Sequence, residues 1–419
     1  MKCVILAGGH GTRLRPLTLS VPKPLIEFCN RSIIEYQIDA AKKAGVDHII
    51  LAVSESQPAL AQRVQKLQEK YSIRIDCSIE TSPMGTAGPL RLAEKLICEP
   101  NDDSDDFLVL NSDVICDYPL LELLNSHRSK KATITILVTK VENPSEFGVI
   151  FHDEEFRIKS FVEKPTNYVS NQINAGVYVL SKTVVNSIPL ENTSIERDIF
   201  PKFVMLGNTF CHPLSGYWAD IGKPIEYLRG QHLYLSNNFS GDFNVCGTTE
   251  TCVSETEKRE ICEIDTGILI RTRSNANLED ADYVKSACAS TPRSDLLEAP
   301  TIYNNVNFKA PVLVHPTAKI GPGSLIGPNV CIGANVVIGK GSRIVRSTIM
   351  EGANVSPNSY IEGSIIGWNS RIGPWVRIEG LSVLGESVGI SEALFIRGCI
   401  VLPHKNVNNN IYEPGVIII

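Results

Sequence analysis

The chain has 419 residues, of which 43% are hydrophobic and 21% are charged, and its formal net charge is -6. This length is enough for two or three domains, and the composition excludes a wholly disordered or collagen-like chain. The mild acidity argues against a dedicated nucleic-acid binder or a polybasic membrane protein. No apolar stretch approaches the roughly 20 residues that span a bilayer, and the N-terminal MKCVILAGG does not fit a signal peptide. We therefore expect a cytoplasmic protein with no membrane association.

The first half of the chain alternates apolar runs with helical patterns. Strands are expected over residues 3–7, 48–53, 73–79 and 107–110, and this βαβ rhythm indicates a parallel sheet. Residues 133–180 are richer in strand patterns, which predicts that the sheet becomes partly antiparallel. The first half therefore belongs to the α/β class, with a mixed sheet.

One helix is predicted between the first two strands. Ser32 and Glu35 have the spacing of a capping box, Ile34, Ile38 and Ala41 form an apolar stripe, and Gly45 stands where a C-terminal cap belongs. In open α/β sheets, ligands bind beyond the carboxyl ends of the strands. The loops that follow the first, third and fourth expected strands are therefore the candidate functional segments.

The last third of the chain is a hexapeptide repeat. An aliphatic residue recurs at every sixth position in two frames, often followed by glycine, which predicts a parallel β-helix whose aliphatic side chains stack inward. Such a coil often supports oligomers. The aliphatic positions are Val314, Ile320, Ile326, Ile332, Ile338, Ile344 and Met350 in the first frame, and Ile366, Ile372, Ile378, Leu384, Ile390, Ile396 and Leu402 in the second.

Residues 237–309 separate these two parts and differ from both. They are rich in Asn, Ser, Thr and acidic residues, and they contain Cys246, Cys252, Cys262 and Cys288 in spacings that match no metal motif. We interpret this segment as a polar insertion or linker. The 12 cysteines of the whole chain form no C-x-x-C pair, which favours free thiols.

The loop GGHGTRLRPLTLSVPKP, residues 8–24, is the strongest candidate for chemistry. Glycines let backbone N–H groups approach an anion closely, although the loop is neither a Walker A motif nor G-x-G-x-x-G. Arg13, Arg15 and Lys23 crowd the same loop, and its prolines stiffen the backbone. Paired cations on a stiff glycine loop point to a polyphosphate ligand.

This loop resembles the signature of the sugar-1-phosphate nucleotidyltransferases. PMGTAGPL, FLVLNSDVICDYP, FVEKP, INAGVYVL, YWADIG and VLPHK are similar to motifs of the β-type catalytic subunits of GDP-mannose pyrophosphorylases. The resemblance implies a Rossmann-like nucleotidyltransferase domain over residues 1–236 and a left-handed parallel β-helix over residues 310–419. It also implies a mannose-1-phosphate guanylyltransferase activity, in which a sugar 1-phosphate attacks the α-phosphate of GTP.

The resemblance also assigns roles to residues, which fit a transfer that depends on charge neutralisation and positioning. Arg13 and Lys23 are the expected catalytic residues, and Asp113 and Asp220 the expected ligands of Mg²⁺, which prefers carboxylates beside phosphates. The residues expected to bind the nucleotide are Leu6, Ala7, Gly8, Gly9, Gly11, Thr12, Arg13, Lys23, Gly85, Asn111 and Asp113. Those expected to bind the sugar phosphate are Gly148, Glu163, Lys164, Asn174 and Gly176.

The resemblance further implies GTP, mannose 1-phosphate, GDP-mannose and pyrophosphate as ligands, and a homo-oligomer that could also take a regulatory α-type subunit. Three alternatives stay open. One is a glucose-1-phosphate nucleotidyltransferase that uses another nucleotide, and one is a non-catalytic regulatory subunit of the same family. The third is an added acyltransferase activity that uses His315 or His404 of the coil, although both histidines fit surface turns beside prolines.

Overall fold

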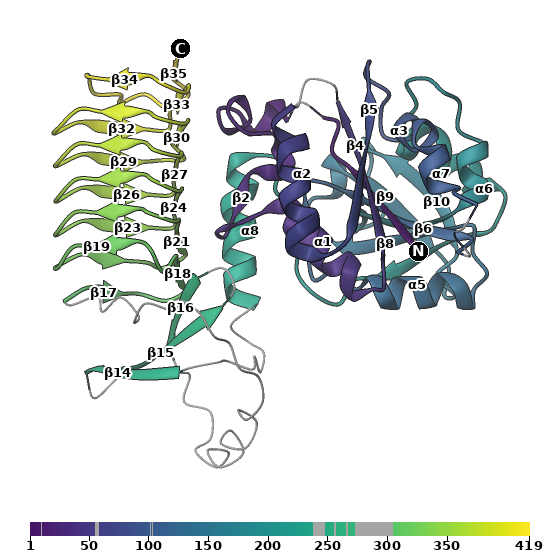
Figure 1. Ribbon diagram of the computed structural model, residues 1–419, viewed down its shortest axis with the longest axis horizontal. Coiled ribbons are helices and arrows are strands. Elements are labelled where there is room, and N and C mark those ends of the chain that lie inside the picture. The colour runs from purple at the N-terminus through teal and green to yellow at the C-terminus, as the bar shows by residue number, and fades with distance from the viewer. Residues whose placement is uncertain are drawn as a thin grey trace. The chain divides into compact units, whose positions relative to one another are not determined.

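The computed structural model describes residues 1–9, 11–54, 58–100, 102, 104–237, 248–254, 257–264, 267–272 and 305–419. The chain divides into two compact units (Figure 1). The first comprises Met1–Leu14, Val21–Ile26 and Ser32–Lys223, and the second comprises Arg15–Ser20, Glu27–Arg31 and Pro224–Ile419. The candidate glycine loop therefore leaves the first unit after Leu14 and returns to it at Val21.

A nine-stranded mixed sheet forms the centre of the first unit. Its main path runs β10-β9-β11-β6-β1-β4-β5, and β8 and β12 join it through β11. Strands β1, β4, β5 and β6 are mutually parallel, whereas β11 runs antiparallel to β6, so the predicted mixed sheet is confirmed. The strands are β1 (Lys2–Leu6), β4 (His48–Ser54), β5 (Arg74–Glu80), β6 (Asp106–Asn111), β8 (Ile134–Lys140), β9 (Gly148–His152), β10 (Ile158–Glu163), β11 (Gln172–Ser181) and β12 (Thr209–Pro213).

Helix α1 (Ile33–Lys43) confirms the predicted helix between the first two strands. The Ser32 hydroxyl donates to the Glu35 carboxylate at 2.7 Å, and Ile34, Ile38 and Ala41 are fully buried. Gly45 follows the helix with φ +83°, the left-handed conformation in which glycine commonly ends helices. The other helices of this unit are α2 (Pro58–Tyr71), α3 (Gly88–Leu92), α4 (Glu94–Ile97), α5 (Leu120–Ser129), α6 (Lys182–Asn186) and α7 (Phe200–Met205).

A short two-stranded ribbon lies beside the main sheet in this unit. β7 (Val114–Cys116) pairs antiparallel with β13 (Trp218–Asp220), so that Val114 lies opposite Asp220. Residues about a hundred positions apart in the chain are thereby brought next to the end of β6.

The second unit contains the predicted coil, in which three parallel sheets stack short strands (Figure 1). Their inward aliphatic side chains form one buried core. The first sheet contains β18 (Val312–Val314), β21 (Val330–Ile332), β24 (Thr348–Ile349), β27 (Ile365–Ile366), β30 (Val383–Leu384), β33 (Ile400–Val401) and β35 (Ile417–Ile418). The second contains β17 (Asn307–Phe308), β20 (Leu325–Ile326), β23 (Arg343–Val345), β26 (Tyr360–Glu362), β29 (Arg377–Glu379) and β32 (Phe395–Arg397). The third contains β19 (Lys319–Ile320), β22 (Val337–Ile338), β25 (Asn354–Val355), β28 (Arg371–Ile372), β31 (Gly389–Ile390) and β34 (Asn406–Val407).

The expected phase of the repeat is wrong at two positions. Ile349 pairs with Ile332 in the buried stack where Met350 was expected, and Val401 pairs with Leu384 where Leu402 was expected. The coil shortens at these corners, where Arg346 and Gly398 have positive φ values of 46° and 55°. A strict six-residue count therefore shifts the assignment by one residue.

Helix α8 (Pro224–Asn237) packs on the coil within the second unit. The buried Gln231 amide donates to the carbonyls of Asn329 and Ser347 at 3.1 and 3.3 Å, and accepts a hydrogen bond from Thr348. The Asn30 side chain donates to the Ile332 carbonyl at 2.9 Å. Part of the N-terminal region is therefore held by the C-terminal coil.

Four of the described strands lie within residues 237–309, of which β17 already belongs to the coil. β14 (Thr248–Ser254), β15 (Glu257–Ile264) and β16 (Gly267–Thr272) form an antiparallel set that joins the coil through β18. The side chains of Cys246, Cys252, Cys262 and Cys288 lie outside the described residues. Among the helices that the structure describes, none is both long and apolar enough to cross a membrane.

Candidate active site

A cavity of about 740 Å³ opens at the carboxyl ends of the parallel strands in the first unit. The glycine loop after β1, the segment after β5 and the residues after β6 form its walls. These are the three loops that the sequence singles out. The predicted nucleotide residues that line the cavity are Leu6, Gly8, Gly9, Lys23, Gly85, Asn111 and Asp113.

The cations of the glycine loop meet an aspartate at one end of this cavity. Lys23 begins a short 3₁₀ turn and donates to Asp113 Oδ2 at 2.6 Å, while Arg13 Nη2 lies 3.5 Å from the same oxygen. Lys23 is largely buried, whereas the Arg13 side chain is 54% exposed. Arg15, which was expected beside them, belongs to a segment of the second unit.

Asp113 and Asp220 converge because the β7–β13 ribbon connects them. A methyl group on Gly222 would lie 2.8 Å from Asp220 Oδ1, 3.2 Å from Arg13 Nη2 and 3.4 Å from Asp113 Oδ2. The two carboxylates and a guanidinium therefore surround one point. The Gly222 N–H donates to Asp220 at 2.8 Å and the Ile221 N–H to the Asp113 carbonyl at 2.8 Å, which fixes this turn.

The electrostatics of this pair favour a bound cation. Burial raises the pKa of Asp113, but the charge and hydrogen bond of Lys23, together with Arg13, outweigh burial and leave that pKa below its ordinary value. The pKa of Asp220 is raised, first by burial and then by the charge of Asp113. A divalent cation between the two carboxylates would relieve this repulsion.

These two carboxylates fit Mg²⁺ better than a metal with an all-protein ligand set. Within the described part of the chain, no group of three or more His, Cys, Asp or Glu residues could hold a metal ion. Mg²⁺ is commonly bound through one or two carboxylates, with waters and substrate phosphates as its other ligands. Asp113 and Asp220 have the chemistry that such a site requires.

Asn111 connects the cavity to the residues that β11 positions. Its Oδ1 is buried and has no hydrogen-bond partner among the described residues, which leaves an acceptor for a ligand hydroxyl. Gly176 has φ +77°, and a Cβ there would lie 3.0 Å from Asn111 Nδ2. Asn174 accepts from the Gly176 N–H at 2.9 Å and donates to Tyr178 at 2.8 Å.

The expected sugar-phosphate pair, Glu163 and Lys164, lies at the end of β10. Lys164 Nζ is 3.9 Å from Glu163 Oε1, and the Lys164 side chain is 56% exposed. A Cβ on Gly148 would lie 2.8 Å from Glu163 Oε2. The pKa of Glu163 is raised by burial and then by the neighbouring Glu196 carboxylate.

Glu196 is a residue that sequence reasoning missed. Its Oε2 accepts hydrogen bonds from Thr86 at 2.6 Å and from Ser194 at 2.9 Å, which ties residues 193–196 to the loop that contains Gly85. Gly85 itself has φ +73°, and a Cβ there would lie 2.4 Å from the Thr193 carbonyl oxygen. Glu196 thus accepts a hydrogen bond from the loop that contains Gly85, and its charge raises the pKa of the Glu163 carboxyl.

Four predicted nucleotide residues, Ala7, Gly11, Thr12 and Arg13, are not among the residues that line the cavity. Ala7 donates its N–H to the Ala52 carbonyl at 2.8 Å. Thr12 and Arg13 belong to the short 3₁₀ helix Thr12–Leu14, which Gly11 directly precedes. His10 lies outside the described residues. In the coil, His315 makes a local turn contact with Thr317 at 2.9 Å, as expected for a surface turn.

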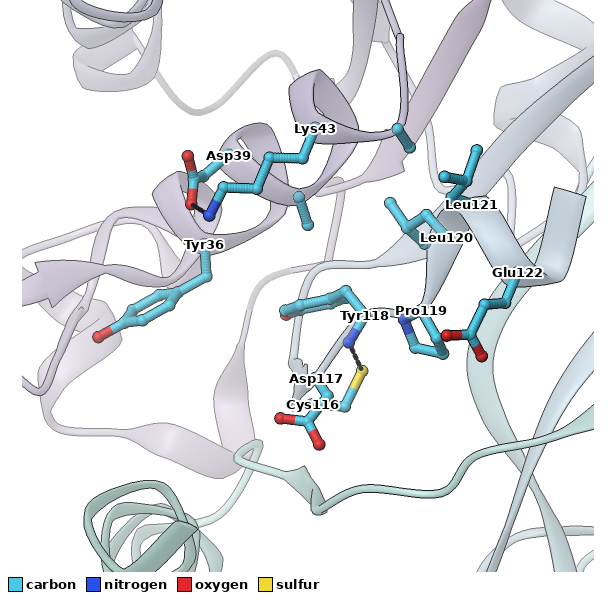
Figure 2. Close-up of a pocket in the computed structure, with 12 residues that line it drawn as sticks. Tyr36, Asp39, Lys43, Cys116, Asp117, Tyr118, Pro119, Leu120, Leu121 and Glu122 are labelled. Carbon is cyan, nitrogen blue, oxygen red and sulfur yellow. Dashed lines mark hydrogen bonds and ion pairs between the residues drawn. The ribbon is translucent and has the colours of Figure 1, made fainter. Parts of the chain in front are cut away.

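A second cavity, of about 400 Å³, lies between α1 and the segment after β7 (Figure 2). Lys43 is the only lysine or arginine among the residues that line it, and its ammonium pairs with Asp39 at 2.9 Å. Asp117 and Glu122 add further carboxylates to its wall. This cavity therefore lacks the cations that a triphosphate requires.

The Rossmann-like sheet, the glycine loop with its two cations and the paired aspartates define a nucleotidyltransferase. Residues 2–237 match the nucleotidyl transferase family model, and residues 308–417 match the model of the GMPPB C-terminal domain. A putative glucose-1-phosphate thymidylyltransferase from Bacillus anthracis, solved in complex with a sucrose, is 22% identical with a TM-score of 0.51. The match covers 59% of this chain and 98% of that one, and supports the fold.

The chain is 42% identical over 418 residues to the mannose-1-phosphate guanylyltransferase catalytic subunit beta of Xenopus tropicalis. It is 41% identical to the protein of that name from Danio rerio and to a mannose-1-phosphate guanyltransferase from Yarrowia lipolytica. Each of these matches covers 100% of both chains. The chain belongs to the mannose-1-phosphate guanylyltransferase family.

Proposed function

We propose that this chain forms GDP-mannose and pyrophosphate from GTP and mannose 1-phosphate. The observation that carries the proposal is the convergence of Lys23, Arg13, Asp113 and Asp220 at one end of the nucleotide cavity. Membership of the guanylyltransferase family supports the choice of base and sugar. The presence of all four groups together favours a catalyst over a non-catalytic scaffold.

In this reaction an oxygen of mannose 1-phosphate attacks the α-phosphorus of GTP, and the bond from that phosphorus to the bridging oxygen of pyrophosphate breaks. Asp113 and Asp220 would hold Mg²⁺, which neutralises charge on the phosphates as it builds up during transfer. Lys23 and Arg13 now share Asp113. When the triphosphate arrives, both cations can exchange this carboxylate for phosphate oxygens, which fixes the reacting phosphorus in line.

The sugar phosphate would occupy the side of the site formed by β10 and β11. Lys164 supplies an exposed ammonium for its phosphate, and Glu163 accepts hydrogen bonds from sugar hydroxyls. Asn174 is held by the Gly176 N–H and by Tyr178. Gly148 leaves room for the Glu163 carboxylate.

We also propose that the protein acts in the cytoplasm and assembles into a homo-oligomer that can take an α-type regulatory subunit. The family name of the relatives from Xenopus tropicalis and Danio rerio, which are called catalytic subunits, supports a partner subunit. Residues 1–236, 237–309 and 310–419 are proposed as catalytic domain, insertion and coil domain. Size measurements of the chain alone and with candidate subunits test the assembly.

The deciding experiment measures pyrophosphate release by the purified protein with GTP and mannose 1-phosphate. We expect release in Mg²⁺ and none after chelation by EDTA. A panel of glucose 1-phosphate, UTP, ATP and dTTP separates this activity from its nearest alternative. Absence of release with GTP and mannose 1-phosphate in Mg²⁺ would overturn the proposal.

A further inference from the structure

Residues 144–147, which we call the bridging loop, lie between β8 and β9 and contact both β13 and the turn after it. The Glu146 carboxylate accepts a hydrogen bond from the Lys223 ammonium at 2.5 Å. The Phe147 ring packs edge-on against the Trp218 ring, with centroids 5.5 Å apart. In the chain, Trp218 and Lys223 lie on either side of the proposed metal ligand of β13. The two contacts therefore hold the segment around that ligand from both sides.

The bridging loop also contacts the sugar-phosphate side of the site. The Lys164 N–H donates to the Phe147 carbonyl at 3.0 Å. Lys164 has a φ of +48°, which is unfavourable for a residue other than glycine, so its conformation depends on contacts such as this one. The Trp218 indole N–H donates at 2.9 Å to the carbonyl of Ala175, which lies between the two β11 residues expected to bind the sugar phosphate. The bridging loop therefore connects the proposed sugar-phosphate ligands to the proposed metal ligands.

Charges that the reaction is proposed to use surround this ion pair. The pKa of Glu146 is lowered first by the hydrogen bond and charge of Lys223, and then by the charges of Lys164 and Arg13. Glu146 is therefore ionised at neutral pH. The Lys223 and Glu146 side chains are 40% and 60% exposed, and ion pairs with such exposure contribute little to the free energy of unfolding. A role in positioning can therefore be tested apart from a role in stability.

We propose that Glu146 and Lys223 are positioning residues, whose ion pair holds the proposed sugar-phosphate ligands at a fixed distance from the proposed metal ligands. In-line attack requires the attacking oxygen to lie about 3–3.5 Å from the phosphorus, and a misplacement of about 1 Å can lower the rate by about a hundredfold. A contact that spans the two sides of the site can therefore act on kcat without touching either substrate. The inference rests on the proposed function and adds two residues that act through Lys164 and Asp220.

The test exchanges the charges of the pair. In Lys223→Glu two carboxylates face each other, and in Glu146→Lys two ammonium groups do. We expect each variant to lower kcat by about three- to tenfold, the range for loss of an exposed ion pair and its replacement by a repulsion. The double variant restores the attraction in the reverse sense, so its kcat should lie within about twofold of that of the unmodified chain. KM for GTP should be unchanged in all three, because neither residue lines the nucleotide cavity.

The matched control is Glu142→Lys, which makes the same charge change at an exposed carboxylate of the same connection between β8 and β9. It should leave kcat unchanged. A double variant that recovers no activity would overturn the inference, because Lys223 would then act on a substrate directly rather than through Glu146. An unaltered kcat in Lys223→Glu would also overturn it.

A spectroscopic measurement separates this inference from the proposed function. The chain has three tryptophans, and ¹⁹F NMR of protein labelled with 5-fluorotryptophan reports on each of them, with Trp218 assigned through Trp218→Phe. Because the Phe147 ring lies against Trp218, we expect the Trp218 resonance to shift in Lys223→Glu and to return in the double variant, with or without turnover. If the resonance responds in this way but no GDP-mannose forms, only the proposed function fails. If GDP-mannose forms and the resonance stays fixed in Lys223→Glu, only the role of the pair fails.

Discussion

At the scale of single residues, the site depends on charged groups that lie close enough to shift one another's pKa values. Asp113 and Asp220 are expected to be indispensable, because each would supply one of the two proposed carboxylate ligands of the metal. We predict that Asp113→Asn and Asp220→Asn each lower kcat by at least about a hundredfold, the scale of removing one group that stabilises transition-state charge. Thermal unfolding should show that the fold is retained. Unchanged turnover in either variant would remove that residue from the metal site.

Glu196 offers a second prediction at this scale. Its carboxylate raises the pKa of Glu163 beyond the effect of burial, and the ionised form of Glu163 is the stronger acceptor for the sugar hydroxyls that we propose it binds. As the pH falls, Glu163 is therefore protonated earlier than an ordinary glutamate, and activity declines. Glu196→Gln removes the repulsion, so the acid limb of kcat/KM for mannose 1-phosphate should move to lower pH.

The matched control is Glu191→Gln, an exposed carboxylate in the same segment, which should leave the acid limb in place. A limb that stays fixed in Glu196→Gln, or that moves to higher pH, would contradict this coupling.

At the scale of elements, the loop after β5 is held in a conformation that only glycine tolerates. Gly85 combines a φ of +73° with the close approach of the Thr193 carbonyl oxygen. We predict that Gly85→Ala destabilises the protein by about 1–3 kcal/mol and also raises KM for GTP. Gly45→Ala is the control, because Gly45 has φ +83° but nothing within 4 Å of its would-be Cβ.

Gly45→Ala should lower the unfolding temperature through the same backbone strain and leave KM for GTP unchanged. Equal KM values for both variants would mean that the approach to Thr193 has no role in nucleotide binding.

Sequence patterns predicted most elements because their signals are local. Helix α1 could be predicted from its cap and apolar stripe, and the coil could be predicted because the hexapeptide pattern occurs again in each turn. The parallel strands place the three functional loops at one edge, so Lys23 and Asp113 could be expected near each other. Glu196 could not, because no spacing connects it with Thr86 or Glu163. A strict six-residue count misses the phase of the coil because the corners at Arg346 and Gly398 are one residue shorter than such a count allows.

At the scale of the whole molecule, the two units share the N-terminal region. Phe28 is fully buried and packs edge-on against Tyr227 of α8, with ring centroids 5.4 Å apart. Glu27 accepts the Tyr227 hydroxyl at its carbonyl and the Trp368 indole N–H at its carboxylate. We predict that a fragment of residues 1–237 aggregates and loses most turnover, because it retains this aromatic cluster without the coil that covers it.

Co-expression of residues 238–419 with that fragment should restore soluble protein and GDP-mannose formation. Full activity of residues 1–237 alone would show that the coil has no part in maintaining the glycine loop.

The path of residues 15–31 also limits how this protein can diverge. Arg15–Ser20 and Glu27–Arg31 belong to the second unit, although they lie within and directly after the signature loop of the first. A recombination event that exchanged only the C-terminal coil between two relatives would leave these segments packed against a coil of different sequence. The two parts must therefore be inherited and altered together, and a functional hybrid of two such enzymes would have to take residues 15–20 and 27–31 from the donor of its coil.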